Sequence, residues 1–330
     1  MTSVVSRLPD ITGEERTRIL ATERVPDAHG KLLADIPAMT ALEAGGAGQA
    51  GRLPSRFTVA AWNMERCYFP ARSAAKLAPF KPSIVLLSEM DNGMARTGQL
   101  NTAAEMARDL GMHYAYGVEF YEMELGSPIE LPYCKDDFNA SGWHGNAILS
   151  SVPFVKLALF RLDERGRWFC ADHADASDEP RMGGRMAVAA IVDSEAGSVC
   201  VVSTHLESAA DSDYRKNEFA SLLAYVDAFA PGLPVIIGGD LNTGNHVPPD
   251  YDWRGEALFD FARDEGYSWD LTPEGITIRS SLITPNNDRQ MKLDWFCTRG
   301  LEGEAGPLLK AIDAQGPLSD HECILCTVRL

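Results

Sequence analysis

The sequence predicts an α/β fold in which two β-sheets pack face to face and helices cover their outer faces. Two observations support this prediction. Strand-like apolar runs recur from residue 56 to the end of the chain, and helical patterns lie between them. Several of the runs are apolar on both faces, which is typical of strands that are covered on both sides. With 330 residues, 45% of them hydrophobic, the chain can bury a large core.

The expected strands follow one another along the second part of the chain. They are FTVAAWNM (57–64), SIVLLSEM (83–90), YAYGVEF (114–120), GNAILSS (145–151), GGRMAVAAIV (183–192), SVCVVSTHL (198–206), LPVIIGG (233–239), KLDWFCT (292–298) and CILCTVRL (323–330). A helix is predicted over 101–112, where Asn101 can cap the start and Gly111 favours the end. A second helix is predicted over 214–232. Its apolar stripe is expected in the core and consists of Phe219, Leu222, Leu223, Val226 and Phe229.

The chain divides near residue 55. Residues 1–55 form a polar, partly helical N-terminal extension, whose last stretch, EAGGAGQAGRLPS, is interpreted as a flexible glycine-rich linker to the domain over 56–330. The extension is expected to pack across the domain or to mediate self-association. It lacks the apolar region of a signal peptide, and no apolar run approaches the roughly 20 residues of a membrane span. Seven scattered cysteines fit reduced thiols, so a cytoplasmic location is expected. Cys323 and Cys326 form a CxxC pattern in an apolar strand and are expected to pack in the core.

The charge of the chain limits its partners. A formal net charge of −17 and a pI near 4.8 repel polyanions, and no Lys/Arg stripe is visible, so tight binding to a long nucleic acid is not expected. The acidity suits solubility or a group of carboxylates around a divalent metal ion equally well.

Polar side chains cluster where the predicted strands end. Asp240 and Asn242 illustrate the pattern, because alternate side chains of an extended segment share a face. By itself this pair also fits an Asx turn, and each of the other residues has a similar local explanation. The full set is Asn63, Glu65, Glu89, Asp91, His205, Asp240, Asn242, Asp294, Asp320 and His321. Independent caps and turns would not all select metal-binding or acid–base residue types, so the set favours one active site.

From residue 56 to 330 the sequence resembles the endonuclease/exonuclease/phosphatase superfamily, the DNase I-like fold. The resemblance rests on WNMER, LLSEMD, GNAILS, STHLES, GGDLNT, KLDWF and SDHE, which occur in the order of the family. It implies a four-layer α/β sandwich with the site at one end of two packed mixed sheets. It also implies hydrolysis of a phosphoric ester.

Such chemistry needs a divalent cation and a positioned water for in-line attack. Hard oxygen ligands suit Mg²⁺ or Mn²⁺. The family pattern makes Glu89 the central metal ligand, with Asn63 and Glu65 beside it and Asp320 as a further metal-site acid. Many relatives have Asp where this chain has the longer Glu65.

The same pattern assigns the proton-handling groups. His321 would handle a proton or contact the phosphate, with its ring oriented by Asp294. Asp240 would orient or deprotonate the attacking water, Asn242 would hold a phosphate oxygen or Asp240, and His205 would donate to the developing negative charge. Whether Asp240 or His321 takes the proton is left open.

The expected rim of the site is acidic and aromatic, and rim loops carry specificity. It comprises 118–140, 163–180 and 246–256, with Tyr121, Tyr133, Trp143, Trp168, Tyr251 and Trp253 able to wall an organic pocket or to anchor the loops. The expected substrate-binding residues are His144, Asn146 and Arg185, with Arg181 nearby.

These observations predict a metal-dependent phosphohydrolase that acts on a small phosphodiester or phosphomonoester. A Mg²⁺-dependent nuclease of the same superfamily is the alternative. A catalytically silent binding module is a further alternative, but it has no physical need for the intact polar set.

Overall fold

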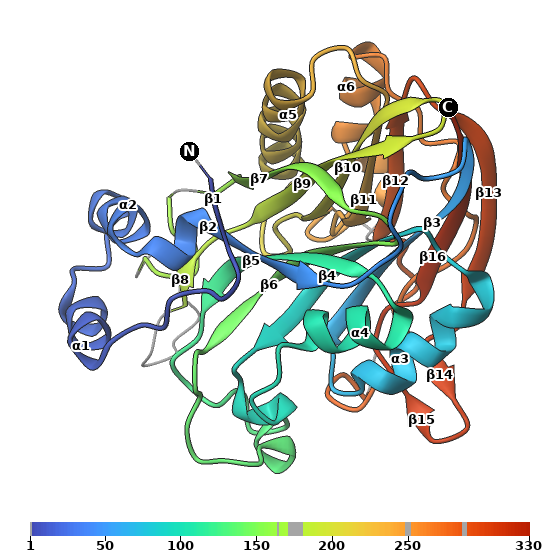
Figure 1. The fold of residues 1–330 in the computed structure, drawn as a ribbon. Coiled ribbons are helices and arrows are strands. Elements are labelled where there is room, and N and C mark those ends of the chain that lie inside the picture. Colours follow the sequence, from blue (N-terminus) through green and yellow to red (C-terminus); the bar gives the residue numbers. More distant parts are fainter. Residues whose placement is uncertain (1, 164, 171–180, 248–251, 286–288) are drawn as a thin grey trace.

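The computed structural model describes residues 2–163, 165–170, 181–247, 252–285 and 289–330. Within this part of the chain the strands form two large mixed sheets that pack face to face (Figure 1). The larger sheet has the order β1 (Ser3–Val5), β2 (Ala41–Gly46), β5 (His113–Tyr121), β6 (Trp143–Ser150), β4 (Ile84–Asn92), β3 (Arg56–Arg66), β16 (Cys323–Arg329), β13 (Glu302–Leu309), and β8 (Met182–Gly183) also pairs with β5. The smaller sheet has the order β12 (Asp294–Arg299), β11 (Val235–Asp240), β10 (Gly197–His205), β9 (Met186–Ser194), β7 (Phe154–Arg161). A short hairpin joins β14 (Ile312–Asp313) and β15 (Gly316–Pro317).

Helices cover the outer face of each sheet and complete four layers. On the larger sheet α3 (Pro70–Leu77) and α4 (Thr102–Leu110) bury apolar residues against strand residues such as Leu87 and Tyr116. On the smaller sheet α5 (Ser212–Phe229) and α6 (Leu258–Asp264) do the same. Between the sheets lies a third buried cluster, which includes Leu86, Val188 and Ile236. This confirms the four-layer sandwich.

The predicted elements agree closely with the structure. Each of the expected strands is present, and both expected helices form. The Asn101 side chain accepts a hydrogen bond from the Ala104 amide at 3.0 Å, and Gly111 ends α4 with φ of 65°. The apolar stripe of α5 is buried, as is the Cys323/Cys326 pair. Strands β7 and β13 were not predicted, because both lie at sheet edges where exposed positions interrupt the apolar pattern.

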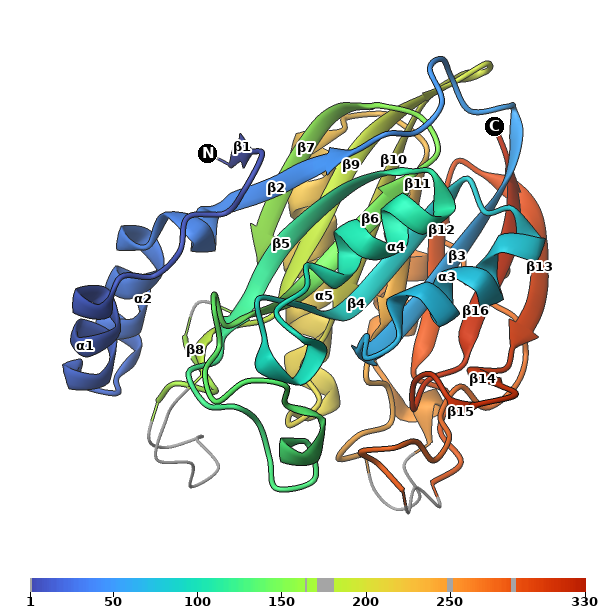
Figure 2. The same cartoon turned by 60° about the horizontal axis from the view of Figure 1, so that its bottom comes forward.

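The glycine-rich stretch after residue 42 was interpreted as a flexible linker, and this is wrong for its first residues. Residues 41–46 form β2, which pairs antiparallel with β5 along the side of the molecule (Figure 2). Small residues are needed there because a Cβ added at Gly46 would lie 2.4 Å from the Met112 carbonyl oxygen, and Gly46 has φ of 82°. The close approach of two strands, which a single sequence does not display, explains these glycines.

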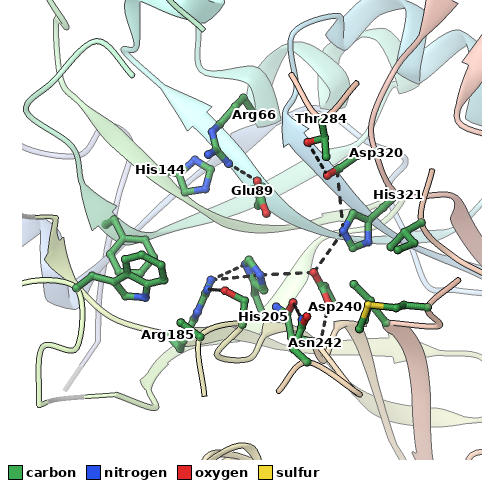
Figure 3. Close-up of a pocket in the computed structure, with 18 of the residues that line it drawn as sticks. Arg66, Glu89, His144, Arg185, His205, Asp240, Asn242, Thr284, Asp320 and His321 are labelled. Atoms are coloured by element: carbon green, nitrogen blue, oxygen red, sulfur yellow. Dashed lines mark hydrogen bonds and ion pairs between the residues drawn. The ribbon is translucent and has the colours of Figure 1, made fainter. Parts of the chain in front are cut away.

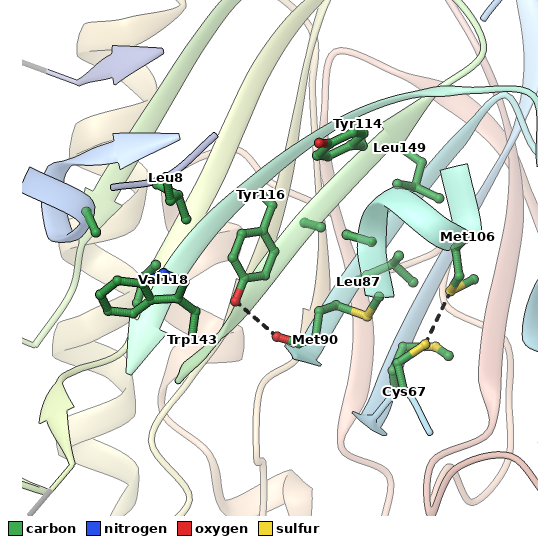
Figure 4. Packing of buried hydrophobic residues seen from close by; sticks show 14 of the residues in the cluster. Leu8, Cys67, Leu87, Met90, Met106, Tyr114, Tyr116, Val118, Trp143 and Leu149 are labelled. Carbon is green, nitrogen blue, oxygen red and sulfur yellow. Dashed lines mark hydrogen bonds between the residues drawn. The ribbon is translucent and has the colours of Figure 1, made fainter. Parts of the chain in front are cut away.

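The rest of the extension also contacts the domain. It contains α1 (Gly13–Ala21) and α2 (Pro26–Asp35), and Leu8 belongs to the buried cluster on the outer face of the larger sheet (Figure 4). In the same cluster the Tyr116 hydroxyl donates to the Met90 carbonyl at 3.2 Å. Short 3₁₀ helices complete the fold: η1 (Pro37–Thr40), η2 (Ala78–Phe80), η3 (Ala95–Thr97), η4 (Leu131–Tyr133) and η5 (Trp253–Gly255). None of the helices in the described ranges is both long and apolar enough to cross a membrane.

Candidate active site

A cavity of about 560 Å³ lies at one end of the two packed sheets. The parallel neighbours β3 and β4 end here in the larger sheet, as do β10 and β11 in the smaller sheet. The antiparallel strand β12 begins here, and the loop before β16 arrives at the same place. The expected site residues that line the cavity are Glu89, His144, Arg185, His205, Asp240, Asn242, Asp320 and His321. The others, Asn63, Glu65, Asp91, Asn146 and Asp294, are buried outside its lining.

A chain of polar contacts runs from the buried interior to the cavity through His321. The Nδ1 atom of His321 lies 2.8 Å from Oδ2 of Asp294. Its Nε2 atom lies 3.6 Å from Oδ2 of Asp240, a contact that Figure 3 shows. Asp294 and Asp240 are cross-strand partners on β12 and β11, so the sheet register sets their separation. An ionised Asp294 accepts a hydrogen bond from Nδ1–H, which leaves Nε2 directed toward the cavity.

Charges around the two histidines control their protonation. Burial lowers the pKa of His321, but Asp294, Asp240 and Asp320 raise it more, so this pKa lies well above its ordinary value. His205 lies 3.6 Å from Oδ2 of Asp240 through Nε2. Burial and Arg185 lower the pKa of His205, but Glu119 and Asp240 outweigh them and raise it. Both rings therefore hold a proton more firmly than a free imidazole does.

Asn63 joins two carboxylates at the junction of the sheets. Its Nδ2 atom donates to Glu89 Oε1 and to Asp240 Oδ2, each at 3.0 Å, and its Oδ1 atom accepts from the Glu65 amide at 3.1 Å. The side chain is fully buried. Asn63 thus positions Glu89 and Asp240. Its expected role as a metal ligand would require its Oδ1 atom to face the cavity, but this atom accepts from the Glu65 amide instead.

Arg66 is a site residue that the sequence analysis did not single out, although it lies within the quoted motif WNMER. Its guanidinium forms an ion pair with Glu89 and donates through Nε to Glu130 at 3.2 Å. The residue has φ of 75°, and its side chain lines the cavity. Burial raises the pKa of Glu89, but the positive charges of Arg66 and His205 outweigh this effect and bring the pKa well below its usual range. No periodicity marks this arginine, since its partners come from other strands and loops.

Behind Arg66 lies a buried cluster of alternating charges. Arg96 is fully buried and binds Asp91 through two nitrogens at 2.8 and 2.9 Å, Glu122 at 2.8 Å and Glu130 at 3.2 Å. Asp91 also lies 2.9 Å from Nδ1 of His144, which fixes the ring that lines the cavity. This cluster supports both Arg66 and His144 from the interior.

Glu65 lies away from the cavity. Its carboxylate accepts hydrogen bonds from Ser281 and Thr284, and it lies in the field of Asp320. Burial, followed by the negative charge of Asp320, raises the pKa of Glu65 to about 8. The side chain of Glu65 is therefore directed toward the loop over 281–284.

We expect Glu65→Gln to remove a loss of stability at high pH. Between the ordinary pKa of 4.5 and about 8 the folded protein retains a proton that the unfolded chain releases, so rising pH favours unfolding. The wild type and Glu65→Gln should have similar Tm values near pH 5 with chelator present, and the variant should become the more stable one by pH 8. Parallel Tm profiles from circular dichroism would contradict this expectation.

Of the remaining expected site residues, Arg185 and Asn242 line the cavity, whereas Asn146 does not. Arg185 lines it and is held by Glu119 Oε1 at 2.6 Å and Glu207 Oε2 at 3.2 Å. Asn242 also lines it, but its Nδ2 donates to the Leu206 carbonyl at 2.9 Å while its backbone amide donates to Asp240 at 2.8 Å. Asp240 and Asn242 therefore form a local Asx-type contact and line the cavity at the same time. Asn146 donates to the Met186 carbonyl at 3.0 Å, which fixes β6 to the other sheet and keeps this side chain out of the cavity.

The acidic rim predicted from the sequence is only partly acidic in space. In the segment 118–140, Glu119, Glu122 and Glu130 are buried and paired with arginines. The cavity is instead lined by many cationic or proton-bearing side chains: Arg66, Arg181, Arg185, Arg289, His144, His205, His246 and His321. Opposite charges from distant segments neutralise each other in the interior, which a count along the sequence cannot show.

Most of the aromatic residues expected at the rim are structural. Tyr121 and Trp143 pack on each other with ring centroids 5.2 Å apart, and Trp253 packs on Trp295 at 4.8 Å. Tyr133 packs on Tyr68 at 5.1 Å. Trp168 lines the cavity. Tyr251 lies outside the described residues.

The donor chemistry fits a hard divalent cation at Glu89 and Asp320. Both carboxylates line the cavity and are about equally exposed, at 19% and 20% of the side chain. Burial and the negative charges of Glu89 and Asp240 raise the pKa of Asp320 to about 6, against the opposing effect of His321. A cation would relieve this repulsion. In the described residues no three His, Cys, Asp or Glu side chains form a ready metal cluster, and Arg66 neutralises Glu89 instead.

Comparisons with known proteins agree with this architecture. The sequence profile of the Endonuclease/Exonuclease/phosphatase family matches residues 60–321. A search of curated proteins found no match.

Solved structures with the same fold include an endonuclease/exonuclease/phosphatase from Beutenbergia cavernae, at 17% identity and a TM-score of 0.57, covering 83% of this chain and 72% of that one. The human Nocturnin catalytic domain with bound sulfate is similar at 18% identity and a TM-score of 0.55, covering 84% and 96%. A humanized D. rerio TDP2 is similar at 17% identity and a TM-score of 0.51, covering 84% and 100%. At these identities the likeness shows the fold.

Proposed function

Because this chain belongs to the Endonuclease/Exonuclease/phosphatase family, we propose that it is a divalent-metal-dependent phosphohydrolase that cleaves a small phosphodiester or phosphomonoester by in-line attack of an activated water. Members of the family are typically hydrolases of phosphoric esters. The observation that carries the proposal is the Asp294–His321–Asp240 chain, which ends in a cavity lined by arginines and by Glu89. A cavity of about 560 Å³ has the size of a small-molecule site.

The protein groups divide the work of hydrolysis. Asp240 orients the attacking water and accepts its proton, since its Oδ2 atom faces both histidines and is held by Asn63. His321, protonated and steadied by Asp294, donates a hydrogen bond or a proton at Nε2. His205 and Arg185 stabilise negative charge that develops on the phosphoryl oxygens.

Glu89 and Asp320 are the residues that would hold the metal ion. Enzymes of this family generally use divalent metals, commonly Mg²⁺. When bound, such a cation neutralises a phosphoryl oxygen and the leaving group.

A pair of chromogenic esters tests the proposal. Release of p-nitrophenol from bis-p-nitrophenyl phosphate and from p-nitrophenyl phosphate is followed with Mg²⁺, with Mn²⁺ or with chelator, for the wild type and for Glu89→Gln. We expect turnover of at least one ester that requires metal and is lost in the variant. Turnover that survives both chelator and Glu89→Gln would contradict the mechanism, and no turnover of either ester would favour a silent binding module.

Arg66→Gln is expected to strengthen binding of Mn²⁺. The guanidinium competes with a cation for Glu89, so its removal should lower the Kd by about tenfold, on the order of one partly buried ion pair. Titration calorimetry of the full chain measures this directly, with Arg254→Gln as a control on an exposed arginine. Weaker binding in Arg66→Gln would show that Arg66 instead holds Glu89 in its binding position.

A small phosphorylated substrate is the proposed partner. The net charge of −17 opposes a long nucleic acid, and the cationic side chains lie inside the cavity.

A further inference from the structure

Two different walls flank the reaction centre, which comprises His205, Asp240 and His321. In Figure 3 Arg185 lies on one side of Asp240 and His321 on the other. Beyond Arg185 the cavity is lined by Phe120, Trp168 and Arg181, here called the aromatic wall. Next to His321 it is lined by Ile278, Met291 and Leu293, here called the aliphatic wall.

The aromatic wall is rigidly attached to the reaction centre. The rings of Phe120 and Trp168 are nearly perpendicular, at 77°, with centroids 6.3 Å apart. The Trp168 Nε1 atom donates to Oε2 of Glu207 at 2.9 Å, and the same oxygen accepts from Arg185 at 3.2 Å. One buried carboxylate therefore sets the orientation of both the indole ring and the arginine. A ring held in this way offers its face at little entropic cost.

A further positive charge lies at the edge of this wall. The Arg181 guanidinium is 5.6 Å from the centroid of the Trp168 ring, and its Nε atom pairs with Glu122 at 3.2 Å. Glu122 also pairs with the buried Arg96, so its single negative charge is divided between two arginines and Arg181 keeps part of its positive charge. The side chain is 37% exposed and borders the cavity. An aromatic face beside a partly exposed cation suits a flat ring that carries a negative charge.

The aliphatic wall is attached to the other side of the centre. Ile278, Met291 and Leu293 form a small buried cluster of their own, apart from the clusters that support the sheets. Ile278 forms a β-bridge with His321, and Thr277 Oγ1 accepts from the amides of Leu293 and Asp294 at 2.8 and 3.2 Å. This wall presents an apolar surface within reach of a group bound at His321.

We propose that the substrate is a small phosphodiester with one organic group on each wall: a planar aromatic group bearing a second negative charge on Phe120, Trp168 and Arg181, and a less polar group against Ile278, Met291 and Leu293. This inference rests on the proposed function, because the phosphoryl group lies between the walls at Asp240. A monoester has an organic group on one side only and would leave one wall facing water.

Binding of simple probes tests the aromatic wall without catalysis. Adenosine 5′-monophosphate, adenosine and ribose 5-phosphate are titrated calorimetrically into the full chain with chelator present. Trp168→Leu should raise the Kd of both adenine compounds about tenfold and change that of ribose 5-phosphate less than about twofold. Trp168→Phe retains a ring face and should restore most of the affinity. Arg181→Gln should weaken the monophosphate about fivefold and leave adenosine unchanged.

Tyr225→Leu and Arg108→Gln are matched controls, since both side chains are exposed and remote from the cavity. Equal Kd values in Trp168→Leu and Tyr225→Leu would overturn the inference, even if the chromogenic esters are hydrolysed and the proposed function stands. Binding that depends on Trp168 without hydrolysis of any ester would support the aromatic wall and contradict the proposed function.

Hydrolysis then tests the two-sided arrangement. The kcat/KM for p-nitrophenyl thymidine 5′-phosphate should exceed that for p-nitrophenyl phosphate by at least about tenfold, and Met291→Ala should raise the KM of the diester. A preference for the monoester would overturn the diester assignment.

Discussion

Arg96→Met is expected to destabilise the folded protein by about 3–5 kcal/mol, because it leaves three buried carboxylates without their shared cation. Arg96 is fully buried and contacts Asp91, Glu122 and Glu130. Methionine is of similar length and fills much of the space, so the loss reports charge rather than packing. Urea unfolding followed by circular dichroism at pH 7 measures the effect.

The pH dependence of this loss separates charge from volume. Burial raises the pKa of Glu130, but Arg66 and Arg96 lower it to about 2, so the carboxylate is ionised in the folded wild type. Without Arg96 its protonation becomes easier, and the stability difference between variant and wild type should shrink as the pH falls from 7 to 5. Arg108→Met, at an exposed helix position, is the control and should change stability little. A loss in Arg96→Met that is independent of pH would point to packing.

His321→Ala is expected to lower kcat/KM for the better chromogenic ester by about 10³-fold, which is within the range for loss of a positioned acid–base group. The ring links Asp294 to the cavity, because its Nδ1 atom lies 2.8 Å from Asp294 Oδ2. His113→Ala, on the opposite end of β5, is the control and should retain activity. An effect in His321→Ala no larger than in His113→Ala would remove His321 from the reaction.

Asp294→Asn distinguishes the role of the carboxylate from that of the ring. Asp294 raises the pKa of His321, so the neutral amide should lower it and move the high-pH limb of the kcat/KM profile to lower pH. The direction follows because a cationic imidazolium loses its nearest negative charge. A profile that keeps its position while kcat falls would indicate that Asp294 only orients the ring.

Prediction of the fold from the sequence succeeded where the signal is local. The alternation and apolar runs that mark β3, β4, β10 and β11 lie within single segments, and so do the Asn101 cap and the buried stripe of α5. The prediction missed the edge strands β7 and β13, because exposed positions interrupt the apolar pattern along both of them.

The candidate site was predicted in part for the same reason. Carboxylates and histidines at strand ends are visible in the sequence, and sheet register then brings His205, Asp240 and Asp294 together across neighbouring strands. The directions of Glu65, Asn146 and Arg66 were not visible, because each depends on a partner far away in the chain. Glu65, for example, binds Ser281, 216 positions away.

The sequence by itself determined the family, the positions of the main strands along the chain and the residue types at their ends. These are properties of local pattern and of ordered motifs. The tertiary structure alone decided which charges face the cavity. Burial forces acidic side chains such as Glu119 and Glu130 to pair with arginines from other segments, and this leaves an acidic protein with a cavity rich in cations. Pairing over long sequence distances is set by how the sheets pack, and no single segment records it.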